Sequence, residues 1–255
     1  MDAAAEIAHV LERAQVAYVL WGWMALGLVG AYQRSGAIEI IVSDSQMQLA
    51  CNSLAKIGLK PCRDDECETV VLGRLRPVPA AHFHIGFKYR GCTALSFLAK
   101  SELLWWWKDF PLLAPGKDHP DILLTTDPRL PPCVEYGCTG PWTDLHPIRI
   151  LNPSSFTEAI ILLACRDYNQ PNHLFPTWGG MLDALRGYKE YPATLVKKSL
   201  RPEFQAFWKD YCSDRSVDQI YAGFGRKLRY ELIKADRLPA PPAYSALKTG
   251  FNLDF

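Results

Sequence analysis

The sequence predicts an α+β protein, with a mixed sheet and flanking helices over residues 1–150 and a helical part over residues 151–255. Two observations support this prediction. Helix-like and strand-like patterns alternate through the first sixty residues and strands continue in the middle, whereas the chain after Asn152 shows only helical spacing of apolar residues. A composition of 49% hydrophobic and 22% charged residues over 255 residues excludes a disordered, collagen-like or heptad-repeat chain.

The first sixty residues are expected to form three helices separated by two strands. Asp2 is predicted to cap the first helix, which runs to Arg13 with apolar residues at the spacing of one helical face. A short strand is predicted at 17–20, a helix rich in small residues at 23–32, a strand at 37–42, and a helix from Ser43 or Asp44 to Ile57. The strand at 37–42 is β-branched and mostly apolar, which indicates burial on both faces.

The middle of the chain is expected to be more irregular, and the last third helical. Strands are predicted at 68–72 and 80–88 and a helix at 96–108, while the proline-rich segment 109–147 is expected to be a long loop containing a strand at 121–125. A loop of this length usually carries function or packs as a lid. Helices are then expected from Pro153 and over 178–188, 202–211 and 217–235.

Cysteine usage and hydropathy favour a cytoplasmic protein. Cys62 and Cys67, and Cys133 and Cys138, form two pairs with four intervening residues, which could together hold zinc or be free thiols in loops. The closer two-residue spacing is the stronger zinc signal, so free thiols are favoured here. The longest apolar run, 17–31, is interrupted by glycines and shorter than the ~18–20 residues of a membrane span, so no membrane partner is expected.

Positive charge is concentrated in the C-terminal third. Residues 186–237 contain twelve Lys/Arg and seven Asp/Glu, a net charge of +5, whereas the rest of the chain carries sixteen and twenty, a net of −4. This asymmetry indicates an anionic partner, or alternatively a solvated helical face. The candidate RNA-binding residues are Lys197, Lys198, Arg201, Arg226, Lys227 and Tyr230, because cations around an exposed aromatic ring suit an RNA backbone with a stacked base.

Two N-terminal segments carry a family resemblance. Val19-Leu-Trp-Gly-Trp-Met24 and Gly36-Ala-Ile-Glu-Ile-Ile-Val-Ser-Asp44 resemble the strand–glycine–helix and acidic-strand motifs of the nucleotidyltransferase superfamily, which has the DNA polymerase beta-like fold. The resemblance covers roughly residues 1–108 and implies a nucleotidyltransferase-like fold. In the family, paired carboxylates on one strand share Mg²⁺ ions with a triphosphate, and the glycine allows backbone amides to approach the phosphates.

This chain departs from the family pattern at the charged positions. Ala37 stands where the first acid of the pair is expected, Glu39 alone remains, and the later strand reads His82-Phe-His-Ile-Gly86. Trp23 replaces the small residue after the glycine. A single carboxylate does not hold two Mg²⁺ ions against water, so we expect neither a catalytic metal nor another cofactor.

The residues that remain define the predicted site. Glu39, His82 and His84 are the candidate catalytic acid–base residues, and Gly22, Trp21 and Trp23 are the candidate substrate-binding residues. The histidines could instead be imidazoles on a solvated strand face, Glu39 a solvated or ion-paired acid, and the tryptophans core residues.

Three functions are compatible with these features. The favoured one is metal-independent group transfer from an aminoacyl-tRNA, because the acids of the metal site are missing and the C-terminal third is basic. In size and single-domain build the chain is similar to the small arginine-containing cyclodipeptide synthases of fungal specialised metabolism. That resemblance implies peptide-bond formation that yields a small diketopiperazine, with Glu39 holding the arginine guanidinium. The alternatives are a nucleotidyltransferase acting on a small acceptor and a catalytically inactive binding protein of the same fold.

Overall fold

The computed structural model describes residues 1–30, 36–64, 67, 76–86, 93–107, 119–135, 138–170, 174–187, 200–213, 223 and 225–242. Within these residues, helices and strands combine into an α+β architecture, as the sequence predicts. The elements are α1 (Asp2–Arg13), β1 (Tyr18–Trp21), α2 (Gly22–Val29), β2 (Ala37–Val42), the short 3-10 helix η1 (Asp44–Gln46), α3 (Met47–Ala55), β3 (Ala81–His84), β4 (Ala94–Ala99), α5 (Lys100–Leu103), β5 (Ile122–Leu124), β6 (Arg149–Leu151), α6 (Pro153–Asp167), α7 (Phe175–Gly187), α9 (Pro202–Tyr211) and α11 (Arg226–Lys234).

The described strands form one six-stranded mixed sheet in the order β3-β4-β2-β1-β6-β5. β2 runs parallel to β4 and antiparallel to β1, and β6 runs parallel to β1. β3 and β5 pair antiparallel to their neighbours at the two ends of the order. The two strands with the most continuous apolar sequence, β1 and β2, lie in the middle and are buried along their whole length, because both faces of a central strand are covered.

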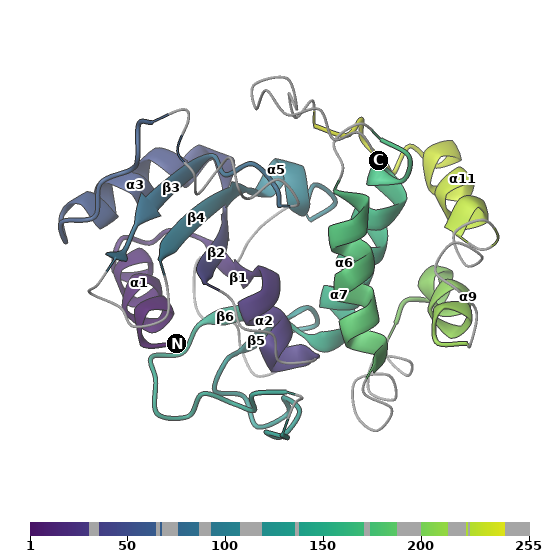
Figure 1. Cartoon of the computed structure of the whole chain (residues 1–255), viewed down its shortest axis with the longest axis horizontal. Helices are drawn as coiled ribbons and strands as arrows, with labels where there is room; N and C mark the ends of the chain where they lie inside the picture. Colours follow the sequence, from purple (N-terminus) through teal and green to yellow (C-terminus); the bar gives the residue numbers. More distant parts are fainter. Residues whose placement is uncertain are drawn as a thin grey trace.

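Helices divide into a group beside the sheet and a group beyond it (Figure 1). α1 and α3 pack on one another, while α2 contacts β1 and β2. α6 packs along α7 and contacts β6, and α11 packs on α6 and α9 at the far end of the molecule from β3 (Figure 1). The buried side chains of both groups join in one hydrophobic cluster, so the helical part shares its core with the sheet.

Local sequence signals explain where several helices begin. Asn152 caps α6, since its side chain accepts a hydrogen bond from Ser155 N at 2.8 Å, and Pro153 occupies the first turn as expected. Asp2 is not the cap of α1: it lies in the first turn, where a carboxylate favours the positive end of the helix. Asp44 likewise does not cap its own helix, because its carboxylate accepts hydrogen bonds from Ser101 N and Oγ at the start of α5.

The main correction to the predicted fold concerns residues 94–108. The expected helix at 96–108 is instead strand β4 followed by the four-residue helix α5. The sequence of β4, Ala-Leu-Ser-Phe-Leu-Ala, has no β-branched residue. All six residues nevertheless pair with β2, and β4 lies in the sheet between β2 and β3. β6 is also an unpredicted strand, and the expected strand at 68–72 lies outside the described residues.

The described part of the 109–147 segment packs against α2. Thr139 N donates a hydrogen bond to Gly27 O at 2.6 Å, and the Cys138 thiol donates to Gly30 O. Trp142 is buried and its backbone N–H donates to Thr125 O at 2.8 Å. Cys138 and Thr139 therefore attach the proline-rich loop to α2, and the expected strand in this segment is β5, which pairs with β6.

Candidate functional site

Glu39 lies in the middle of a row of side chains that crosses the sheet. It is directly opposite Trp21 on β1 and Ser96 on β4, and Ser96 is in turn opposite His82 on β3. Residues that pair directly across neighbouring strands point to the same face. Trp21, Glu39, Ser96 and His82 therefore share one face, and the Glu39 side chain is only 5% exposed.

Gly22 places the Glu39 carboxylate at the start of α2. This glycine directly follows β1 and has φ +68°, in the left-handed region that favours glycine. A Cβ atom on Gly22 would overlap Glu39 Oε2 and lie 2.8 Å from Glu39 Cδ. The carboxylate therefore sits directly against the first residue of α2, at the helix end whose free N–H groups favour negative charge.

Glu39 is a buried acid whose pKa reflects burial and one charged neighbour, Arg76. Burial raises the pKa of Glu39, and the positive charge of Arg76 opposes that rise. Among the described residues, no hydrogen bond contributes to this pKa. A buried carboxylate in such a setting favours either its own protonation or the binding of a cationic group, because a lone charge is costly to bury.

The neighbours of Glu39 do not supply a second carboxylate. The residue two positions earlier on β2 is Ala37, and the flanking partners in the row are Trp21 and Ser96. The sequence interpretation grouped His82 and His84 with Glu39, but the structure places β4 next to β2 and β3, which carries the histidines, one strand further away. Along this row of described residues, therefore, no pair of acids is available to share two Mg²⁺ ions with a triphosphate.

His82 and His84 lie apart from Glu39 and next to two cysteines. At a strand spacing of about 4.8 Å, β3 lies roughly 10 Å from β2. The two rings pack edge to face with centroids 5.5 Å apart, and burial lowers the pKa of His82. Cys67 Sγ lies 3.4 Å from His84 Nε2, and Cys62 N donates a hydrogen bond to His82 O at 2.8 Å. The structure thus gives the histidines sulfur neighbours, and their acid–base role remains a prediction.

The four-cysteine zinc set considered from the sequence is not formed by the described residues. The ligating group that they contain joins Cys62 and Cys67 to the two histidines instead. Cys138 is buried beside Gly30, and burial raises its pKa to about 11. Cys133 is exposed.

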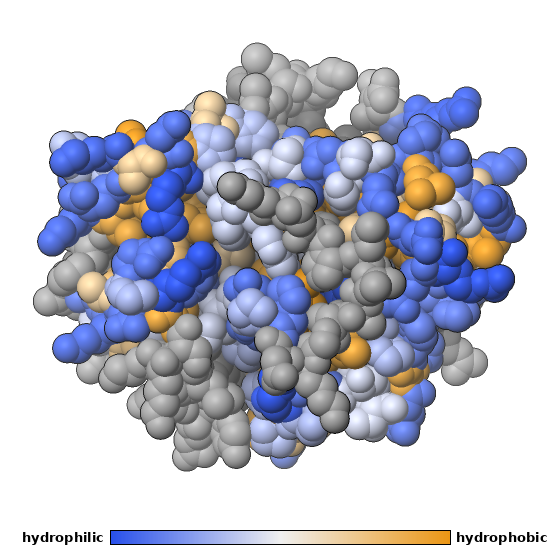
Figure 2. Space-filling model, turned by 180° about the vertical axis from the view of Figure 1, so that it is seen from behind, coloured by the Kyte–Doolittle hydropathy of each residue, from blue (hydrophilic) through white to orange (hydrophobic). Residues whose placement is uncertain are grey.

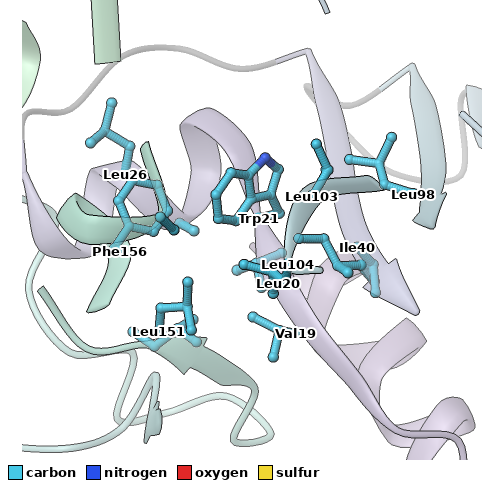
Figure 3. Packing of buried hydrophobic residues seen from close by; sticks show 14 of the residues in the cluster. Val19, Leu20, Trp21, Leu26, Ile40, Leu98, Leu103, Leu104, Leu151 and Phe156 are labelled. Carbon is cyan, nitrogen blue, oxygen red and sulfur yellow. The ribbon is translucent and has the colours of Figure 1, made fainter. Parts of the chain in front are cut away.

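The candidate substrate-binding tryptophans have different environments. Trp21 is almost fully buried, and its ring lies 5.1 Å from that of Phe156 on α6 within the cluster drawn in Figure 3. Its indole N–H has no hydrogen-bond partner among the described residues. Trp23 is half-buried and faces Gly180 of α7. Trp21 is therefore a core residue opposite Glu39 in the row, and Trp23 lies between α2 and α7.

The candidate RNA-binding residues are brought together only in part. Arg226, Lys227 and Tyr230 are all exposed on α11, and 64% of the surface of Tyr230 is accessible to solvent. Arg201 is held instead by an ion pair with the buried Glu158, with 2.5 Å between Arg201 Nη2 and Glu158 Oε2. Lys197 and Lys198 lie outside the described residues. Seen from behind, hydrophilic residues predominate at both ends of the molecule, with hydrophobic patches among them (Figure 2).

Sequence reasoning missed a buried polar network between α6 and α7. Arg166 donates to Asp167 through Nε at 2.7 Å and Nη2 at 2.9 Å, and Trp178 Nε1 donates to Asp167 Oδ2 at 2.7 Å. The Arg166 guanidinium also lies over the Trp105 ring, 5.0 Å from its centroid. Adjacent Arg and Asp on a helix give no sequence signal of burial, because such residues are usually exposed.

Comparison with known proteins leaves the family undetermined. The sequence matches no protein-family model and no curated protein. A search of the described residues also finds no helix with the length and apolar character needed to cross a membrane.

Proposed function

We propose that this chain is a metal-independent group transferase on a nucleotidyltransferase-like scaffold, and that its donor is an aminoacyl-tRNA. The observation that carries the proposal is the Glu39 carboxylate, which is buried against Gly22 at the start of α2 without a partner acid in its row. This arrangement keeps a strand–glycine–helix–acid geometry while lacking the paired carboxylates of two-metal phosphoryl transfer.

An aminoacyl ester is a donor whose transfer needs no metal. The amino group of one aminoacyl residue attacks the ester carbonyl carbon of the other, the ester C–O bond breaks, and the tRNA ribose hydroxyl leaves with a proton. A second attack of the same kind closes the diketopiperazine ring. Such a reaction requires a base, a site for the oxyanion and fixed positions for the two reactants.

Glu39 suits the recognition of a cationic substrate group in this reaction. A buried carboxylate in this setting is stabilised most by a guanidinium, which donates two parallel hydrogen bonds to it. An arginyl residue therefore fits the site, in keeping with an arginine-containing cyclodipeptide as product.

The exposed cations of α11 supply a surface for the RNA part of the donor. Arg226 and Lys227 lie one helical turn before the exposed Tyr230 on α11, so the surface combines phosphate-binding charge with a ring for base stacking. α6 stands between α11 and the sheet (Figure 1), so a nucleic acid bound at α11 must extend past α6 to bring its aminoacyl end to Glu39. Aminoacyl-tRNA as substrate also implies a cytoplasmic site of action.

The test is expression of the full chain in a bacterial host with mass spectrometry of the small molecules that accumulate. The wild-type chain should produce an arginine-containing diketopiperazine and co-purify with tRNA, and Glu39→Gln should abolish the product while the protein remains folded. Glu6→Gln, an exposed acid of α1, is the matched control and should leave the product unchanged.

Other outcomes contradict the proposal in distinct ways. Full product formation by Glu39→Gln removes Glu39 from the reaction. Mg²⁺-dependent release of pyrophosphate from a nucleoside triphosphate would make the chain a nucleotidyltransferase. If the chain makes no product and binds no tRNA but recovers partner proteins in a pull-down, it is the catalytically inactive binding protein.

A further inference from the structure

We propose that Cys62, Cys67, His82 and His84 bind a structural zinc ion at the β3 end of the sheet. One ligand atom from each of these residues lies within 4.8 Å of the other three. Two thiolates and two imidazoles are a donor set typical of tetrahedral structural zinc sites. This inference does not depend on the proposed function.

The distances are close to those that a zinc ion imposes. Zn–S bonds of about 2.3 Å and Zn–N bonds of about 2.0–2.1 Å in a tetrahedron place the ligand atoms roughly 3.3–3.8 Å apart. Cys67 Sγ and His84 Nε2 are 3.4 Å apart, within this range. The longest separation in the group, at most 4.8 Å, requires movements of about 1 Å, which side-chain rotation supplies.

The backbone holds the four residues in position. His82 and His84 are two residues apart on β3, so their rings project from the same face of the strand. The hydrogen bond of 2.8 Å from Cys62 N to His82 O fixes the first cysteine beside the strand. Cys67 N donates to Asp64 O at 3.2 Å, and the Cys67 thiol lies beside His84.

His82 provides an independent indication of a ligand. Its side chain is buried, and its Nε2 atom has no hydrogen-bond partner among the described residues. Buried polar nitrogen atoms are nearly always paired in folded proteins. Coordination of a metal ion from the direction of Cys62 and Cys67 would satisfy this atom.

The site is built for structure and not for catalysis. Four protein ligands complete the tetrahedral shell, so no position remains for water or substrate. The ion would join the 62–67 segment to β3, which ends the order of described strands. With His82 and His84 as ligands, Glu39 on β2 is left as the acid of the proposed active site, roughly 10 Å away across β4.

Two other uses of these residues lead to different measurements. Cys67 and His84 alone would resemble the thiol–imidazole pair of a cysteine nucleophile. Cys62 and Cys67 alone could form a disulfide in an oxidising environment. Neither alternative explains the gathering of all four donor atoms or the buried His82 nitrogen without a hydrogen-bond partner among the described residues. A bound zinc ion explains both observations.

The experiment measures the metal content of the untagged full chain, purified without chelator, by inductively coupled plasma mass spectrometry. One zinc ion per chain is expected, with X-ray absorption showing two sulfur ligands at about 2.3 Å and two nitrogen ligands at about 2.0 Å. Replacement by Co²⁺ should give the visible absorption of a tetrahedral site together with a thiolate charge-transfer band.

Variants separate this site from adventitious binding. Cys67→Ser and His84→Ala should each lose most of the zinc, whereas Cys133→Ser, at an exposed cysteine outside the group, should retain one ion per chain. His84→Cys keeps four ligands and should also retain it, which controls for a folding defect in the other variants.

The proposal is wrong if the wild-type chain contains no zinc and develops no tetrahedral Co²⁺ spectrum. It is also wrong if Cys67→Ser and His84→Ala keep one zinc ion per chain, or if mass spectrometry shows Cys62 and Cys67 joined as a disulfide. Rapid selective alkylation of Cys67 in a metal-free wild-type chain would support the thiol–imidazole pair instead.

Discussion

Replacing Gly22 with alanine tests the central geometry of the site, the contact between Gly22 and the Glu39 carboxylate. The substitution has two costs. An alanine at φ +68° costs about 1–2 kcal/mol of backbone strain. Its Cβ would also lie 2.8 Å from Glu39 Cδ, closer than real Cβ contacts, so the buried carboxylate must move at about 1–3 kcal/mol. The expected loss of unfolding free energy is therefore roughly 2–5 kcal/mol.

Two further variants divide this loss into its parts. Gly58→Ala also introduces a side chain at a positive φ, but nothing lies within 4 Å of its new Cβ, so it should cost only the strain of about 1–2 kcal/mol. Combining Gly22→Ala with Glu39→Ala removes the clash, and the cost of the alanine in that background should fall to the same value. Equilibrium unfolding in urea, analysed as a double-mutant cycle, measures each term. A Gly22→Ala loss equal to that of Gly58→Ala, or unchanged by Glu39→Ala, would refute the contact.

Three further predictions address the charges of the molecule. Burial raises the pKa of Glu39, so the stability linked to its protonated form is present below the unfolded pKa of about 4.3 and lost as the pH rises through the folded pKa. Between the unfolded and the folded pKa, the unfolding free energy of Glu39→Gln should therefore rise relative to wild type by about 1.4 kcal/mol for each unit of pKa elevation. A difference between the two proteins that does not change with pH in chemical denaturation would contradict this prediction. Asp167→Asn should destabilise the chain by about 3–5 kcal/mol because it leaves the buried Arg166 charge uncompensated. Arg129→Ala breaks the surface ion pair with Asp127 and should cost at most about 1 kcal/mol. Thermal and urea unfolding of both variants measures the two losses. The double charge reversal Arg226→Glu and Lys227→Glu should weaken tRNA binding and reduce the slope of log affinity against log salt concentration by about 1–2, as measured by filter binding. An unchanged slope would show that α11 is not part of the RNA-binding surface.

The sequence predicts the N-terminal half of the sheet well because local and global signals agree there. Ala37–Val42 is apolar and β-branched, and it becomes the buried central strand β2. Pro153 marks the start of α6 and Pro202 that of α9, as their helix-start preference predicts. These elements depend on patterns within a few residues, which are visible without knowledge of the fold.

The sequence fails where pairing over long distances decides the structure. Ala94–Ala99 carries no strand signal of its own and becomes β4 because β2 and β3 both pair with it. Ser96 was consequently missed as the neighbour of Glu39. The 62–67 segment and β3 are likewise joined by a hydrogen bond between residues twenty positions apart, so cysteine spacing alone could not identify the histidines as partners.

The separation of Glu39 from the two histidines changes how the site must be tested. The sequence interpretation grouped all three as acid–base residues, which predicts that Glu39→Gln and His84→Ala lose activity in the same way. In the structure, Ser96 lies between Glu39 and His82 in the row, and His84 is next to Cys67. A structural zinc ion therefore predicts different results for the two variants. Glu39→Gln should lose product while it keeps its zinc and its fold, whereas His84→Ala should lose zinc and stability. His84→Cys, which keeps four ligands, should have zinc, stability and product. Loss of product by His84→Cys with its zinc intact would return His84 to the reaction as an acid–base residue.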